Sequence, residues 1–271
     1  MVIFKKKRPK RQIPEIAAPR LPEDERVVAI GDIHGRSDLL VILLDGIAEY
    51  EAEFPVRHTT EIFLGDYVDR GQNSAEVIDI LMAQGTDHHR RICLTGNHEH
   101  LLLLACYDVE VLRFWLQHCG AQSTLRSFGL TPPPANATHD ALSETCFDLE
   151  RMLGPDRLAF LASLPYQHEK HGHIFVHAGL RPNVPVEQQT DDDRIHIRGD
   201  FLKQDYDFGA VVVHGHTPRK HIDIRPFRIN VDTGAFATNR LSCLVIENGA
   251  YRLIQAGPDG YEILNLDTLP A

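Results

Sequence analysis

The chain has 271 residues, 43% of them hydrophobic, and its 28 basic and 38 acidic residues give a formal net charge of -10. This length indicates one or two domains, and the hydrophobic content is ample for a core, which excludes disorder throughout the chain. The longest apolar stretches fall far short of the roughly 20 residues that cross a bilayer, and the acidic balance argues against a general nucleic-acid binder.

The N-terminus is predicted to be a basic arm over residues 1–25, ahead of one domain over residues 26–271. Residues 1–20 hold seven basic residues and one acid, without the apolar core or cleavage site of a secretory signal. A cytoplasmic setting and a flexible, solvated arm are therefore expected, and a partner-binding or membrane-surface tail is the alternative. The five cysteines form no C-x-x-C pair and are expected to be buried, reduced thiols.

The first part of the domain alternates short β-branched runs with stretches of helical periodicity. The expected strands cover residues 26–30, 61–64 and 91–95, and the helices that follow them start near residues 37, 74 and 101. Three strand-then-helix units within about 90 residues predict an α/β core.

The second part of the chain has a different pattern. Residues 101–165 are mostly helical, broken by a loop at 131–140, and are predicted to be a helical insertion in the domain. Strand-like runs then return, with no long helix after Phe208, so the remaining chain is expected to be rich in β-structure. These runs are residues 173–177, 210–214, 227–232, 241–247 and 251–255.

Five of the predicted strands end in oxygen or imidazole side chains beside glycine. The carboxyl ends of strands are where ligands bind in open α/β sheets, and glycine allows close backbone approach. A mixed set of Asp, His and Asn suits Mn, Fe, Zn, Co or Ni, so the pattern predicts a metal site, with two ions as the expected content. The motifs are GDIHG (31–35), GDYVDRG (65–71), GNHE (96–99), HAG (177–179) and HGHT (214–217).

Each motif taken alone also has a structural interpretation. Asp32 could cap the following helix, Asn97 could stabilise a turn, and His177 could be a satisfied core histidine. Five such motifs at strand ends in one chain favour a shared site over five separate structural roles.

In this combination the motifs resemble the signature of the phosphoprotein-phosphatase branch of the calcineurin-like metallophosphoesterases, over residues 26–240. The resemblance implies an α/β fold, a β-sandwich of two mixed sheets flanked by helices, with the helical insertion added to it. It implies a dinuclear centre of divalent transition-metal ions, with Mn as the first expectation. One ion would be held by Asp32, His34 and Asp66, and the other by Asp66, Asn97, His177 and His216.

Catalytic roles follow from the same motifs. His98 is not needed as a ligand and is predicted to be the general acid, oriented by Asp69, a pair that resembles the family's His-Asp dyad. Arg70, Arg198 and Asn97 are predicted to bind phosphate, since guanidinium offers planar bidentate donors. A surface salt bridge with residues 191–193 is the alternative for Arg198.

The remaining histidines are assigned structural roles. His214 is expected to pack within or beside its strand, and Asp232 is expected either to support His216 or to form a turn. Seven further histidines are predicted to lie at turns or helix ends, as surface or capping residues: His88, His89, His100, His118, His168, His171 and His173.

Three functions compete. The first is a metal-dependent phosphomonoester hydrolase, a serine/threonine protein phosphatase in which a metal-bridging hydroxide attacks phosphorus, with phosphotyrosine or small phosphomonoesters as further substrates. The second is a diadenosine tetraphosphatase, a relative that resembles G-D-x-Q-G where this chain has His34. The third, a non-enzymatic metal-bound module, disagrees with the intact ligand and dyad positions.

The chain lacks the S-A-P-N-Y loop of the eukaryotic phosphatases, so it resembles the bacterial and phage members of the family more closely.

Overall fold

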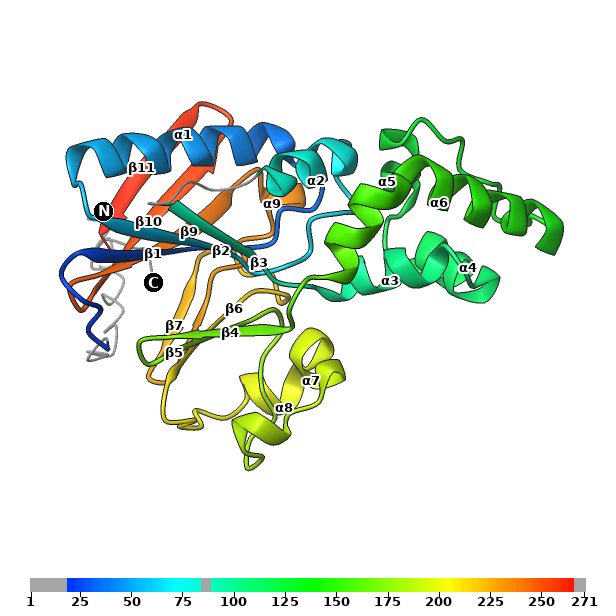
Figure 1. Ribbon diagram of the computed structural model, residues 1–271. Coiled ribbons are helices and arrows are strands. Elements are labelled where there is room, and N and C mark those ends of the chain that lie inside the picture. The colour runs from blue at the N-terminus through cyan, green and yellow to red at the C-terminus, as the bar shows by residue number, and fades with distance from the viewer. Residues whose placement is uncertain (1–18, 84–88, 266–271) are drawn as a thin grey trace, which may run out of the picture.

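Two mixed sheets pack face to face in the computed structural model (Figure 1), which describes residues 19–83 and 89–265. In the six-stranded sheet the order is β11-β10-β9-β1-β2-β3; β1 to β3 run parallel, and β9, β10 and β11 are antiparallel to their neighbours. Its strands are β1 (Glu25–Ile30), β2 (His58–Phe63), β3 (His89–Cys93), β9 (Leu241–Glu247), β10 (Ala250–Gly257) and β11 (Gly260–Asn265).

The five-stranded sheet has the order β4-β5-β6-β8-β7, with β5, β6 and β8 parallel and an antiparallel strand at each edge. Val27 and Ala29 face the second sheet, whereas Val28 and Ile30 face the helices, because successive strand residues point to opposite faces. The strands of this sheet are β4 (Gln167–Lys170), β5 (His173–Val176), β6 (Val211–His214), β7 (Asp223–Arg225) and β8 (Arg228–Asn230).

Helices cover the outer faces of both sheets and extend from one end of the molecule (Figure 1). Leu39, Leu40 and Leu43 of α1 are buried in the core cluster that also holds Val28 and Ile30. On the other sheet, Phe201 of α8 packs with strand residues of β5 and β6. The helices are α1 (Ser37–Glu53), α2 (Ser74–Met82), α3 (Asn97–Ala105), α4 (Val109–His118), α5 (Gln122–Ser127), α6 (His139–Ala162), α7 (Asp191–His196), α8 (Gly199–Leu202) and α9 (Ala235–Thr238), with a 3₁₀ turn at Val186–Gln188.

The structure confirms the predicted fold class of two mixed sheets flanked by helices, and the three predicted strand-then-helix units. The third helix starts earlier than the predicted position near residue 101. It begins at Asn97, where the side chain of Glu99 caps its N-terminus by accepting the backbone N–H of Gly96. The strands β4, β7 and β11 were missed, as short or edge strands carry little alternation. Four helices, α3 to α6, lie between β3 and β4, in the region proposed as an insertion.

The predicted domain starts at residue 26, and the described part of the chain begins ahead of it, at residue 19. Leu21 is 5% exposed and packs in the cluster between the sheets, so the folded domain includes residues before 26. Residues 1–18 of the proposed arm lie outside the described residues. Among the helices that the structure describes, none is both long and apolar enough to cross a membrane.

Several surface assignments also need correction. His89 and His168 lie in β3 and β4 rather than at turns, and His173 begins β5 with only 1% of its surface exposed. His88 lies outside the described residues. The thiols are free as expected, but Cys119 is only half-buried.

Replacing His173 by Phe is expected to make the protein less sensitive to acid. Burial lowers the pKa of His173 to about 4 in the folded chain, whereas an imidazole in an unfolded chain titrates near 6.5. Below about pH 6.5 the unfolded chain binds a proton that the folded chain does not bind until about pH 4, so acid favours unfolding. The wild type should therefore lose about 1–2 kcal/mol more than His173→Phe between pH 7 and pH 5. Urea denaturation at both pH values measures this difference, and equal losses would contradict it.

Candidate metal centre

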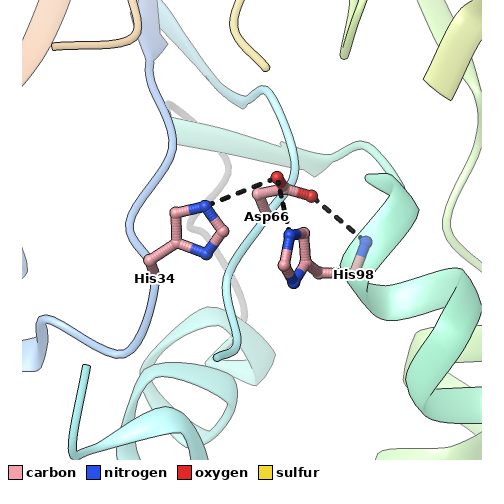
Figure 2. Close-up of side chains that lie close together, drawn as sticks. All are labelled: His34, Asp66 and His98. Carbon is pink, nitrogen blue, oxygen red and sulfur yellow. Dashed lines mark hydrogen bonds and ion pairs between the residues drawn. The ribbon is translucent and has the colours of Figure 1, made fainter. Parts of the chain in front are cut away.

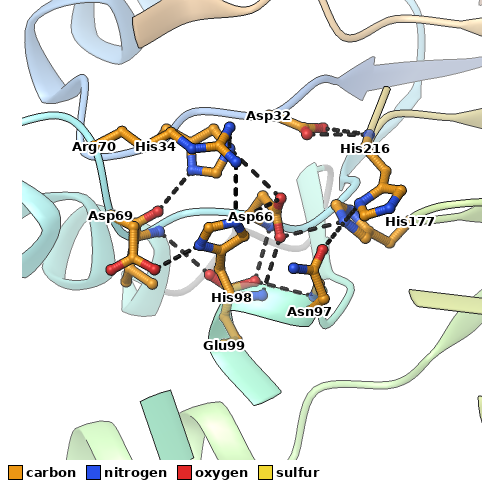
Figure 3. Close-up of polar contacts among 12 residues, drawn as sticks. Asp32, His34, Asp66, Asp69, Arg70, Asn97, His98, Glu99, His177 and His216 are labelled. Carbon is orange, nitrogen blue, oxygen red and sulfur yellow. Dashed lines mark hydrogen bonds and ion pairs between the residues drawn. The ribbon is translucent and has the colours of Figure 1, made fainter. Parts of the chain in front are cut away.

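Apart from Arg198, which lies between α7 and α8, the predicted site residues lie together at one edge of the two sheets, in the loops that follow the carboxyl ends of β1, β2, β3, β5 and β6 (Figure 3). Five of the nine described non-glycine residues with positive φ belong to this set: His34, Asp66, Asp69, Arg70 and His216. Backbone in this region costs of order 1–3 kcal/mol per residue and concentrates at functional sites. The fold therefore maintains strain where these side chains converge.

The first group of convergent side chains lies around His177. Its Nδ1 donates to the carbonyl of Leu64 at 2.9 Å, so Nε2 is the ring nitrogen that faces its other neighbours. Within 3.2 Å of that nitrogen lie Oδ1 of Asp66 and Oδ1 of Asn97, and Nδ1 of His216 is 3.1 Å away. Burial disfavours a charged His177, but Asp66 outweighs burial and raises its pKa, so a divalent cation bound by these four atoms would displace the proton of Nε2.

The second group contains His34, Asp66 and His98 (Figure 2). Nε2 of His34 lies 3.5 Å and Nε2 of His98 3.7 Å from Oδ2 of Asp66. Nδ1 of His34 donates to the carbonyl of Val68 at 2.8 Å, which leaves its Nε2 as an acceptor. In both groups the ligand atoms of His and Asp lie within 4.8 Å of one another, and Asp66 is shared.

The protonation of these groups suits a cation. Burial lowers the pKa of His34 to about 3 and that of His216 to about 2, so both imidazoles are neutral at pH 7. Burial opposes ionisation of Asp66, but the neighbouring histidines, His177 first, hold its pKa well below the usual range. Neutral imidazoles and an ionised carboxylate are the forms that bind metal. The residues present therefore fit two divalent ions.

Asp32 occupies a different position from the one expected of a ligand. Its carboxylate accepts the backbone N–H of His216 at 3.0 Å, and the structure does not bring it into either group. Burial, the charge of Asp232 and the charge of Asp66 raise its pKa. Gly215 makes the contact possible, because a Cβ there would lie 2.1 Å from Oδ1 of Asp32. Asp232 lies beside Asp32 and accepts the backbone N–H of Gly234 at 2.8 Å, which is the turn expected as its alternative role.

The predicted dyad is formed. Nδ1 of His98 lies 2.5 Å from Oδ2 of Asp69, and both side chains are buried. Burial disfavours the charged imidazole, but Asp66 and Asp69 outweigh it and raise the pKa of His98 to about 8. Arg70 donates to Nε2 of His34 at 2.7 Å, and its other terminal nitrogen lies 3.3 Å from Nε2 of His98, so its guanidinium lies at the centre of the site.

Two residues at the rim differ from expectation. Arg198 is exposed and has no ion pair among the described residues, since Asp191, Asp192 and Asp193 pair instead with Arg194, His196 and Arg181. The alternative of a salt bridge is therefore wrong, and the charge of Arg198 contributes to the low pKa of His216. Phe236, which the sequence did not indicate, stacks under Arg70 with 4.6 Å between guanidinium carbon and ring centroid.

Glu99 is a further residue that sequence reasoning missed, although it belongs to the GNHE motif. Its fully buried carboxylate accepts the backbone N–H groups of Asp66 at 2.8 Å, Tyr67 at 2.7 Å and Gly96 at 3.0 Å. These bonds tie the loop after β2 to the start of α3. They hold Asp66 in its left-handed conformation.

Glu99→Gln is expected to lower the free energy of unfolding by about 1–3 kcal/mol. Both carboxylate oxygens of Glu99 accept backbone N–H groups, and in glutamine one of them is replaced by an NH₂ group, which cannot accept these hydrogen bonds. Burial and Asp66 raise the pKa of Glu99 to about 7, so the comparison belongs at pH 8. Urea denaturation measures it, and the exposed Glu110→Gln serves as the control. Equal stability of wild type and Glu99→Gln would show that the carboxylate is not needed.

The geometry is that of a metal-dependent hydrolase site, and the comparisons with known proteins agree. The family model for calcineurin-like phosphoesterases matches residues 25–220. The chain belongs to the calcineurin-like phosphoesterase family.

Relatives within this family include two kinds of enzyme. The chain is 26% identical to the asymmetrical bis(5'-nucleosyl)-tetraphosphatase PrpE of Geobacillus sp. over 227 residues, 77% of this chain and 85% of that relative. It is 30% identical to human serine/threonine-protein phosphatase with EF-hands 1 over 120 residues, 43% of this chain. The matched segment spans only 18% of the human protein's length.

Solved structures support the fold. A crystal structure reported as a candidate diadenosine tetraphosphatase has a TM-score of 0.61 and 22% identity, covering 88% of this chain and 97% of that one. The cold-active protein-tyrosine phosphatase of a psychrophilic Shewanella species has a TM-score of 0.57 and 17% identity, covering 91% and 84%. At these identities the likeness concerns the fold.

Proposed function

We propose that the protein is a metal-dependent phosphomonoester hydrolase that acts as a serine/threonine protein phosphatase. One observation carries the proposal: Asp66 is shared by two ligand groups, and the His98–Asp69 dyad faces the same space. Two divalent ions bound there would bind the phosphoryl oxygens and supply a nucleophile at neutral pH. Mn is the first ion to test, with Fe, Zn, Co and Ni as alternatives.

The side chains around this space have complementary roles in the proposal. His98 gives the proton on Nε2 to the leaving oxygen, while Asp69 keeps its hydrogen bond to Nδ1. Arg70 and Arg198 bind the phosphoryl group, since both bring guanidinium to the site. Asn97 lies close enough to serve as a ligand or to bind phosphate. Asp32 remains part of the proposed ligand set, with its carboxylate 3.0 Å from the backbone nitrogen of His216 at the same edge of the sheets.

A second candidate is a nucleoside-polyphosphate hydrolase. It is favoured by the match to the Geobacillus tetraphosphatase, which extends over 85% of that protein. Against it stands His34, whose Nε2 lies 3.5 Å from Asp66 at the position where the G-D-x-Q-G pattern has glutamine.

A direct comparison of substrates tests the proposal. Protein loaded with Mn is assayed on a phosphothreonine peptide and on diadenosine tetraphosphate, with a phosphotyrosine peptide and p-nitrophenyl phosphate as further arms. Faster turnover of the phosphothreonine peptide is expected. Exclusive turnover of the dinucleotide would replace the first candidate by the second, and no turnover of any phosphate ester would overturn both.

Arg198→Ala is expected to lower kcat/KM for the phosphothreonine peptide by about 10-fold to 100-fold, because charge-assisted hydrogen bonds to phosphate contribute about 1.5–3 kcal/mol. Initial rates over a range of peptide concentrations measure the effect. Arg151→Ala, on the exposed side of α6, is the matched control. Equal values for the wild type and Arg198→Ala would remove Arg198 from the phosphate site.

A further inference from the structure

The carboxylate of Asp69 is held by more than the histidine of the dyad. Nε1 of Trp115 donates to Oδ2 of Asp69 at 2.6 Å, the same oxygen that contacts Nδ1 of His98. The hydroxyl of Thr124 donates to the other oxygen, Oδ1, at 2.6 Å. Asp69, Trp115 and Thr124 are all 0% exposed, so water does not replace either donor.

These two donors come from helices remote in sequence from the loop that carries Asp69. Trp115 lies on α4 and Thr124 on α5, both between β3 and β4. Thr124 also accepts the backbone N–H of Asp69 at 2.9 Å. The helical region therefore fixes both the backbone and the carboxylate of one residue of the candidate site.

The physical consequence concerns the orientation of His98. The χ2 torsion of an aspartate is broad, so its own rotamer preference does not set the plane of the carboxylate. Two short hydrogen bonds from buried, well-packed donors do set it. A fixed carboxylate plane then fixes the imidazole ring that donates to it, and with the ring the direction of Nε2.

We propose that Trp115 and Thr124 are positioning residues for proton transfer by His98. The proposal rests on the hydrolase function proposed above. In the step concerned, a hydroxide oxygen forms a bond to phosphorus and the bond between phosphorus and the leaving oxygen breaks. The electron pair of the broken bond stays on the leaving oxygen, and the proton on Nε2 of His98 moves to it. A phosphate ester with a strongly basic leaving group needs this proton most, and p-nitrophenyl phosphate needs it least.

The kinetic test compares these two kinds of substrate in the full-length, Mn-loaded enzyme. Trp115→Phe removes one N–H with little loss of volume, and Thr124→Val removes one hydroxyl. Each is expected to lower kcat on a phosphothreonine peptide by about 10-fold to 100-fold, and on p-nitrophenyl phosphate by less than about 3-fold. Thr124→Ser restores the hydroxyl and should recover most of the lost rate, whereas Leu112→Met, a buried change on α4, should alter neither substrate.

A spectroscopic test examines the contact without turnover. Trp115 is the only tryptophan in the chain, so one indole N–H signal appears in a ¹H–¹⁵N spectrum and needs no assignment. In the zinc-loaded protein this signal is expected downfield of the usual indole range, and Asp69→Ala should move it back. Thr124→Val should move it by a smaller amount, because the carboxylate turns.

Three outcomes would overturn the positioning role of Trp115 and Thr124 without refuting the proposed function. An indole signal unchanged by Asp69→Ala would show that the contact is not made in solution. Equal rate losses on both substrates would show a general structural effect rather than positioning for proton transfer. Full activity of Trp115→Phe and Thr124→Val would leave the proposed function standing without the positioning role. A wild type inactive on every phosphomonoester would instead refute the function, and the positioning role with it.

Discussion

Asp66→Asn is expected to remove bound metal and to reduce phosphomonoester turnover by at least about 10³-fold. Asp66 belongs to both groups of ligand atoms, so one substitution weakens both sites. A single hydrogen-bond donor to a transition state already contributes about 10²–10³ in rate, and a shared charged ligand should contribute more. Metal analysis after gel filtration measures the bound ions, and a fixed-time assay with p-nitrophenyl phosphate measures the turnover.

Asp79→Asn is the matched control for this experiment. Asp79 lies on α2 and pairs at the surface with Arg157, so the same chemical change there should leave metal content and rate unaltered. Metal content in Asp66→Asn equal to that of the wild type would refute the shared role of Asp66. Loss of activity with full metal content would place Asp66 in catalysis rather than in metal binding.

His98→Asn is expected to lower kcat on a phosphothreonine peptide by about 10²–10⁴-fold, the range of general acid catalysis. His98 lies 3.7 Å from Asp66 through Nε2 and 2.5 Å from Asp69 through Nδ1, so asparagine can fill part of the space but cannot deliver the proton. Metal content should stay close to that of the wild type, since the other predicted ligands are intact. Steady-state kinetics at saturating peptide measures the effect.

The control for His98→Asn is the same substitution at His118, which is exposed at the end of α4. His118→Asn should keep the full rate. An undiminished rate for His98→Asn would exclude it as the general acid. A large loss of metal from His98→Asn would instead assign His98 as a ligand, in agreement with its place in the group of His34 and Asp66.

The local order of the motifs made much of the site predictable. Asp32, Asp66 and His177 each lie one to three residues beyond a strand, and parallel strands present their carboxyl ends at the same edge. The order of the motifs along the chain therefore indicates which side chains meet. The pairing of His98 with Asp69 also followed from the motifs, and the contact is present.

Contacts between distant segments were not predictable in the same way. Trp115 and Thr124 reach Asp69 across 46 and 55 residues of sequence, and Phe236 reaches Arg70 from α9. No spacing rule connects such positions, because the packing of helices against the loop determines them. The absence of an ion pair at Arg198 among the described residues likewise follows from tertiary contacts, because the acids at 191–193 pair with Arg181, Arg194 and His196.

The sequence alone determined the fold class and which residue types meet at the candidate site, because each of these side chains directly follows a strand and the strands end at the same edge. Tertiary structure decided how these side chains are oriented. Glu99 accepts four backbone N–H groups around Asp66, and the carboxylate of Asp32 accepts the backbone N–H of His216. Orientation depends on hydrogen-bond partners that the folded chain brings together from separate elements, and residue types in a linear order do not specify them.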